Sequence, residues 1–250
     1  MAKIDPRVAE GINRQLVDFL LENCERYYLF IYSMVKNEEQ VKNIITKTTF
    51  FSLANARKLK SMPRLKTWFY QLIVKEGMRK MHEYNKYKRD FTYNSQLYAF
   101  METIEPSATN AFKLYYFEGM NIDEVGEILH MKREEINKRL KLVRRTLGID
   151  GSLEDQEDID KMDELIDIYE SPEIPEDLEE VVQGAIQKEQ EDYDRFIAKQ
   201  HRYRIIKPVA LVCAIALWYI ATAVLCKNNE SFAHMVNAVP FIRYLFTPFY

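Results

Sequence analysis

The stretch that decides the fold covers residues 104–149 and reads IEPSATNAFKLYYFEGMNIDEVGEILHMKREEINKRLKLVRRTLGI. Ser107 can cap a helix that continues to Phe117, and Gly119 can supply the left-handed backbone at which such a helix ends. A short helix is then expected over residues 124–129 and, after a turn, a longer one over residues 132–147. Two helices joined by so short a turn are typical of a helix-turn-helix.

The longer helix separates an apolar stripe from a basic face. At 100° per residue, the stripe that should be buried consists of Ile136, Leu140, Val143 and Leu147. Cations on the opposite side can contact phosphates, and Arg or Asn near a helix start can read base edges. The candidate DNA-binding residues are Lys132, Arg133, Asn137, Lys138, Arg139, Lys141, Arg144 and Arg145. A solvated basic face is the alternative, because Glu134 and Glu135 place negative charge at the same end.

A second helical unit is expected upstream, in residues 1–90. Its first helix is marked by apolar residues at three- and four-residue spacing, namely Leu16, Phe19, Leu20, Tyr27, Phe30, Ile31 and Met34. A break after Lys36 ends it, a second helix begins near Glu38, and a third is centred on Trp68. Residues 91–105 are polar with scattered aromatics and are predicted to form a linker.

Charge divides the chain into three parts. Residues 1–150 contain 26 Lys and Arg against 19 Asp and Glu, residues 151–196 contain 3 against 18, and residues 197–250 contain 6 against 1. The basic first part could meet nucleic acid. The acidic residues 151–171 have the composition of a disordered tether, whereas residues 176–196 are predicted to form an amphipathic helix that needs a partner. With 7 Gly and no strand-like alternation, the whole chain is predicted to be all-α.

An uncharged run of 19 residues, 208–226, is predicted to cross a membrane. At about 1.5 Å per residue it would cover about 28 Å, close to the hydrocarbon thickness of a bilayer. Cationic residues before the run favour a cytoplasmic location for everything upstream. These are Lys199, His201, Arg202, Arg204 and Lys207. A buried core helix is the alternative, and the N-terminus has no apolar segment of the signal-peptide kind.

No catalytic constellation competes with these features. The four histidines and three cysteines are scattered, and the chain contains no Gly-rich phosphate loop. We therefore expect no enzymatic activity, no cofactor and no metal site.

Two segments of the first helical unit, together with the helix-turn-helix, resemble the extracytoplasmic-function (ECF) sigma factors of bacterial RNA polymerase. The segments are FIYSMVKNEEQVKNIITKTTF (residues 30–50) and ARKLKSMPRLKTWFYQLIV (residues 56–74). The resemblance implies two partners, promoter DNA and the β′ subunit of core RNA polymerase. Thr46 and Lys47 stand where that family usually has Gln and an acidic residue, and Lys75 stands where it has Asn.

The resemblance also assigns residues to each partner. Polymerase contacts are implied at Ile44, Ile45 and Phe50, and reading of the −35 promoter element is implied for the helix 132–145. Contacts with the −10 element are implied at Arg79, Lys80, Tyr84, Lys86, Tyr87, Lys88 and Arg89. Aromatic side chains among cations also suit an unstacked single strand, because bases stack on the rings and cations follow the phosphates.

The second half resembles a different family, the membrane-anchored anti-sigma factors of the lysozyme-sensing type. The matching segments are ESPEIPEDLEEVVQGAIQKEQ (residues 170–190) and NNESFAHMVNAVP (residues 228–240). In that family a short cytoplasmic helix binds the sigma factor. The resemblance implies an intramolecular inhibitor helix whose apolar face consists of Leu178, Val181, Val182 and Ile186.

The expected organisation has six parts: a helical domain (1–90), a linker (91–105), a helix-turn-helix domain (106–149), an acidic linker with the inhibitor-like helix (150–204), a transmembrane helix (205–227) and an extracytoplasmic tail (228–250). The expected function is that of an autoinhibited, sigma-like factor in the cytoplasmic (inner) membrane, crossing it once, with a regulatory protease as a further partner.

One alternative is a degenerate sigma-like module that acts as a membrane-bound regulatory protein without promoter activity. Another is a one-component membrane regulator, which would need a dimerisation helix.

Overall fold

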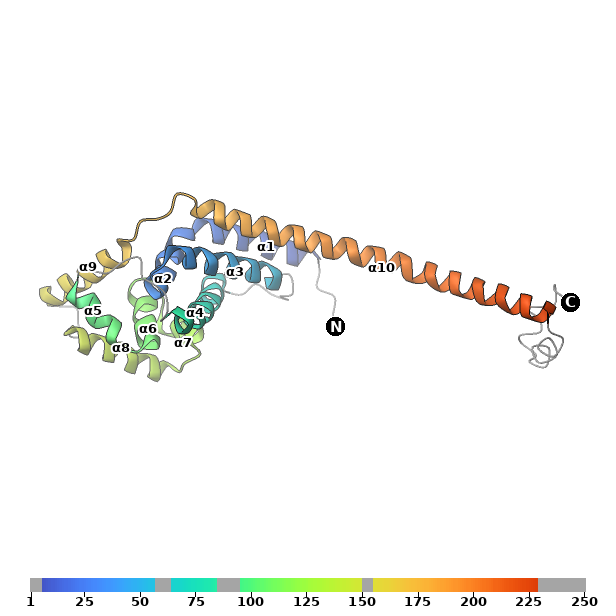
Figure 1. Cartoon of the computed structure of the whole chain (residues 1–250). Coiled ribbons are helices and arrows are strands. Elements are labelled where there is room, and N and C mark those ends of the chain that lie inside the picture. The colour runs from blue at the N-terminus through green and yellow to red at the C-terminus, as the bar shows by residue number, and fades with distance from the viewer. Residues whose placement is uncertain (1–5, 57–63, 85–94, 150–154, 229–250) are drawn as a thin grey trace. The chain divides into compact units, whose positions relative to one another are not determined.

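The computed structural model describes residues 6–56, 64–84, 95–149 and 155–228, and no strand occurs among them (Figure 1). The coarse all-α prediction is confirmed. Contacts divide the chain into two compact units, Met1–Glu191 and Asp192–Tyr250. The helices are α1 (Pro6–Glu22), α2 (Cys24–Val35), α3 (Glu38–Ala56), α4 (Leu65–Tyr84), α5 (Gln96–Thr103), α6 (Pro106–Tyr116), α7 (Ile122–Leu129), α8 (Arg133–Leu147), α9 (Gln156–Glu170) and α10 (Leu178–Asn228).

Aromatic side chains form the core where α2 packs against α4. The rings of Tyr27 and Phe69 meet edge to face with centroids 5.1 Å apart, and those of Phe30 and Tyr70 lie 5.3 Å apart. Such pairs stabilise a core beyond their buried area. The first apolar stripe was predicted as one helix, but it forms two, because the chain leaves the helix at Asn23 between α1 and α2.

The predicted helix-turn-helix is present as α7 and α8. Asn121 caps α7, where its side chain accepts the N–H groups of Asp123 and Glu124 in a capping box. The turn passes so close to α7 that a Cβ on Gly126 would lie 2.8 Å from the backbone oxygen of Met131. Glycine is therefore required where the turn folds back onto α7.

Two segments predicted to lack structure are helical. The expected linker contains α5, which Ser95 caps and which buries Tyr98 and Met101 completely. The expected acidic tether contains α9, which buries Met162, Leu165 and Tyr169. In both cases a few apolar residues at helical spacing, hidden among polar ones, find a partner surface that composition does not reveal.

One hydrophobic cluster connects all parts of the first unit. It extends from Leu16 in α1 through α2–α9 to Leu178 and Val182 at the start of α10. The two helical regions that were expected as separate domains therefore pack together, and the acidic segment packs with them.

Helix α10 continues as one helix from Leu178 through Pro208 to Asn228, so the expected inhibitor helix and transmembrane run share it. In the second unit its large apolar side chains, such as Leu211, Leu217 and Trp218, are more than half exposed. Among the residues that the structure describes, no helix combines the length and apolarity that a membrane crossing requires. The predicted transmembrane helix is not confirmed.

Candidate nucleic-acid interface

The basic face of α8 is exposed, and its apolar stripe is buried. Ile136, Leu140, Val143 and Leu147 are at most 5% exposed, as the helical projection predicts. Within the described part of the chain, no hydrogen bond or ion pair engages the side chains on the opposite face, namely Lys132, Asn137, Lys138, Lys141 and Arg145. These five side chains, here called the α8 basic face, are available for phosphates and base edges.

Two of the predicted DNA contacts are partly occupied by protein partners. The guanidinium of Arg133 donates two hydrogen bonds to the carboxylate of Asp123 in a bidentate arrangement, with Nε 3.0 Å from Oδ1. This hydrogen bond raises the pKa of Arg133. Arg144 donates to the hydroxyl of Tyr116 at 3.3 Å. Both arginines lie beside the α8 basic face, but DNA would have to compete for them.

Arg139 is held by protein partners. Its side chain is only 19% exposed, and its Nη atoms lie 2.8 Å from Glu105 and 3.0 Å from Glu135. It also donates to Ser107, and Ser107 and Arg139 together lower the pKa of Glu105. Arg139 thus ties α8 to the start of α6. The prediction that it contacts DNA is not supported by this position.

The expected −10 contacts are located only in part. Arg79 pairs with Glu76 at 2.6 Å and lowers the pKa of that carboxyl. Lys80 lies on the same helix, and Tyr84 is the last residue of α4. Lys86, Tyr87, Lys88 and Arg89 lie outside the described residues.

The expected polymerase contacts are mostly core residues. Ile44 and Ile45 are at most 1% exposed, because this side of α3 faces the helical bundle. In their present positions these two side chains cannot meet a partner protein. Phe50 is partly exposed and borders a groove of about 520 Å³, which we call the α3 groove. The α3 groove is lined by Thr46, Lys47, Phe50, Phe51, Glu76, Arg79, Ala185 and Lys188.

The start of α10 is docked on the same region. Leu178, Val182 and Ala185 are at most 2% exposed, and Val181 and Ile186 pack against the core cluster. Lys42 of α3 lies 2.7 Å from Asp177, and this hydrogen bond raises the pKa of Lys42. The apolar face predicted for an inhibitor helix is therefore buried against the helical body of the first unit.

A buried polar junction at Glu118 was not found from the sequence. The carboxylate of Glu118 accepts hydrogen bonds from Tyr70 of α4 at 2.5 Å and from Tyr169 of α9 at 2.6 Å. Burial disfavours the charged form of both phenols, and the negative charge of Glu118 disfavours it further. Both effects raise the pKa of Tyr70 and of Tyr169. Arg26 of α2 lies 3.5 Å from the same carboxylate. This Glu118 junction holds α9 to both halves of the first unit, and no local motif marks it, because its partners are distant in sequence.

The described part of the acidic segment leaves the α8 basic face uncovered. A direct contact between α9 and the end of α8 is made by Lys161, whose amine donates to the backbone oxygen of Gly148 at 3.0 Å. Within the described ranges, no acidic side chain of α9 or α10 pairs with the exposed cations of α8. The described acidic residues of α9 and α10 can therefore act on the α8 basic face only through their longer-range electric field.

No family model matches the chain. Over 154 residues the chain is 20% identical to "RNA polymerase sigma factor SigV" of Bacillus subtilis (strain 168), and the alignment covers 56% of this chain and 93% of that protein. A solved structure of the sigma factor RpoE in complex with the anti-sigma factor NepR from Bartonella quintana is similar with a TM-score of 0.45 and 13% identity, covering 54% of this chain and 92% of that chain. Over about half of its length, the chain thus shows homology to a sigma factor of RNA polymerase.

Proposed function

We propose that this chain is a sigma-like initiation factor that directs RNA polymerase to promoters and is held inactive by its own acidic segment and the start of α10. Homology over about half of the chain supports the first part. The observation that carries the DNA-binding role is the α8 basic face, whose apolar side is fully buried and whose cations are unpaired within the described residues. A helix in this state can lie in a major groove without refolding.

The inhibition is proposed to act at the polymerase-facing side. Leu178 and Val182 are buried at the edge of α3, and Ala185 and Lys188 line the α3 groove. A partner that bound in the α3 groove would meet Ala185 and Lys188 of α10 there. Among the residues that the structure describes, none covers the α8 basic face in this way, so inhibition through DNA binding has less support.

Transcription with purified core polymerase tests both parts. The full chain should show weak binding to core polymerase and weak promoter-dependent transcription. The double substitution Leu178→Asp and Val182→Asp should raise both, because it places two charges in a buried apolar contact. Glu179→Ala with Gln183→Ala is the matched control, since these side chains on the same helix are exposed. If polymerase binding rises without transcription, the inhibitor assignment holds and the sigma assignment fails.

We also propose that α10 anchors the protein in the cytoplasmic membrane, where a regulatory protease could release it. The support is the uncharged run 208–226 and the cations before it. Cysteine labelling from the outer face should reach Ser231→Cys and spare Ser152→Cys. Equal labelling of both positions in intact cells would rule out this topology.

A second candidate is a degenerate sigma-like module that regulates transcription without binding polymerase. It is favoured by the burial of Ile44 and Ile45, which keeps both side chains away from a partner protein. Failure of the Leu178→Asp, Val182→Asp protein to bind core polymerase, while it stays folded and binds DNA, would select this candidate.

A further inference from the structure

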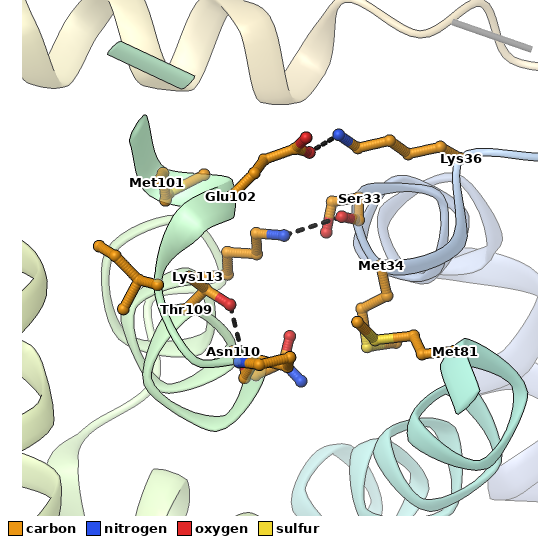
Figure 2. A pocket seen from close by; sticks show the side chains of 11 residues that line it. Ser33, Met34, Lys36, Met81, Met101, Glu102, Thr109, Asn110 and Lys113 are labelled. Atoms are coloured by element: carbon orange, nitrogen blue, oxygen red, sulfur yellow. Dashed lines mark hydrogen bonds and ion pairs between the residues drawn. The ribbon is translucent and has the colours of Figure 1, made fainter. Parts of the chain in front are cut away.

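A cavity of about 120 Å³ lies where the first helical bundle meets the helix-turn-helix half. Figure 2 shows it between Ser33 and Lys36 at the end of α2, Glu102 of α5 and Lys113 of α6. Met81 of α4 borders it as well. A single buried water needs roughly 10–15 Å³ by the same measure, so this cavity has room for a small organic molecule.

Lys113 brings a buried amine to this cavity. The residue is 5% exposed, and its Nζ donates to the backbone oxygen of Ser33 at 2.8 Å. The ring of Tyr98 lies on another side, with its centroid 5.9 Å from Nζ. An ammonium has three N–H donors. Within the described part of the chain, no carboxylate lies at ion-pair distance from Lys113.

The other charges of the cavity do not compensate Lys113. Among the described residues that line the cavity, Glu102 is the only acidic one. Figure 2 shows its carboxylate paired with Lys36. The cavity therefore holds two cations against one anion whenever Lys113 is protonated. A buried cation without a counter-charge is costly, and an anion that reaches it is bound more strongly than at the surface.

Apart from the polar side chains of Thr109 and Asn110, the rest of the lining is apolar and adaptable. Met34, Met81 and Met101 surround the cavity together with Ile104 and Pro106. Methionine side chains adjust to irregular apolar ligands. We propose that this cavity binds a small aliphatic carboxylate, whose negative charge pairs with Lys113 and whose short alkyl chain contacts the methionines.

Binding at this position would affect the whole first unit. The cavity joins α2 and α4 of the first bundle to α5 and α6, so its occupant stabilises the packing of the two halves against each other. This site is independent of the function proposed above, because none of its lining residues belongs to the α8 basic face or to the α3 groove.

Propionate is a suitable probe for the full-length chain. At a propionate concentration about 100 times its Kd, the Tm of the protein should be higher by about 5 °C than the Tm measured in chloride at equal ionic strength and pH. Burial lowers the pKa of Lys113 to about 7. Because the anion requires the protonated amine, its affinity should fall about tenfold for each pH unit above that value.

Two variants and one NMR measurement test whether propionate binds in this cavity. Lys113→Met should abolish the propionate effect, whereas Lys75→Met, an exposed lysine on α4, should keep it. Should Lys113→Met not fold, the unmutated chain with methyl-labelled methionines should show nuclear Overhauser contacts between propionate and Met81 or Met101. The proposal is overturned if chloride stabilises the protein equally, if Lys113→Met responds like the unmutated chain, or if propionate contacts only surface methyl groups.

Discussion

Replacement of the buried Lys113 by methionine should stabilise the protein, and by an amount that depends on pH. The ammonium is buried without a carboxylate partner in the described residues, and desolvation lowers its pKa from 10.5 to about 7. Each pKa unit corresponds to about 1.4 kcal/mol, so the charged amine costs the folded state roughly 5 kcal/mol at low pH. Methionine has a similar length and carries no charge.

The sign of the pH dependence follows from the two pKa values. Below about pH 7, Lys113 is protonated in both the folded and the unfolded state, and its full cost is present. Between about pH 7 and the unfolded value of 10.5, the folded state releases the proton first, so the unmutated protein gains stability as the pH rises. The advantage of the methionine variant should shrink over the same window.

The expected net effect is smaller than the electrostatic cost alone. The hydrogen bond from the charged amine of Lys113 to the Ser33 oxygen stabilises the folded state by roughly 2 kcal/mol, and the variant loses it. We therefore expect Lys113→Met to stabilise the chain by roughly 3 kcal/mol near pH 6 and to destabilise it by about 1 kcal/mol near pH 10, where little of the electrostatic cost remains.

Urea unfolding of the full-length proteins in chloride buffer, followed by circular dichroism at several pH values, measures these differences. Lys75→Met serves as the control, because that amine is exposed and its removal should change stability by less than about 0.5 kcal/mol at any pH. A destabilisation by Lys113→Met that is the same at all pH values would refute the reasoning, since it would mean that burial of the amine does not disfavour its charged form.

Three further predictions concern the other sites. Combined replacement of Lys138, Lys141 and Arg145 by alanine should weaken association with DNA of any sequence. The slope of the logarithm of the binding constant against the logarithm of salt concentration should fall by nearly one for each phosphate that is no longer neutralised. Filter binding over a salt series measures this slope, and an unchanged slope would mean that another surface contacts DNA. Tyr169→Phe should cost about 1.5–3 kcal/mol, because it removes a buried hydrogen bond to the Glu118 carboxylate. Hydrogen exchange should then show faster opening of α9, and equal protection in both proteins would contradict the role of the junction. Gly126→Ala should lower Tm, because the added Cβ meets the Met131 oxygen at 2.8 Å, whereas Gly184→Ala, with open space around it, should leave Tm unchanged or raise it slightly.

Local sequence signals located most of the helices. The alternation of buried and exposed residues on α8 follows from side-chain spacing alone, and the capping residues of α7 mark where it begins. These features depend on neighbours within one or two turns. The same periodicity did not separate α1 from α2, because both helices present apolar residues to one core and the single residue between them hardly shifts the pattern.

Signals from composition were less reliable. Acidic residues dominate α9, and its three buried apolar residues are too few to stand out from a tether. Whether such a helix forms depends on the free energy gained when those side chains are buried against another surface, and the composition of the segment carries no information on that surface.

By itself, the sequence determined that the protein is helical, that it contains a helix-turn-helix, and that one face of the last of those helices is basic, because all three properties depend on short-range spacing and charge. Only the tertiary structure decided that Ile44, Ile45 and Arg139 serve the protein's own packing, that Glu118 joins Tyr70 to Tyr169, and that Lys113 lines a cavity without a carboxylate partner among the described residues. The physical reason is that burial and pairing belong to contacts between helices far apart in the chain, and a side chain's charge or apolarity does not specify which partner it meets.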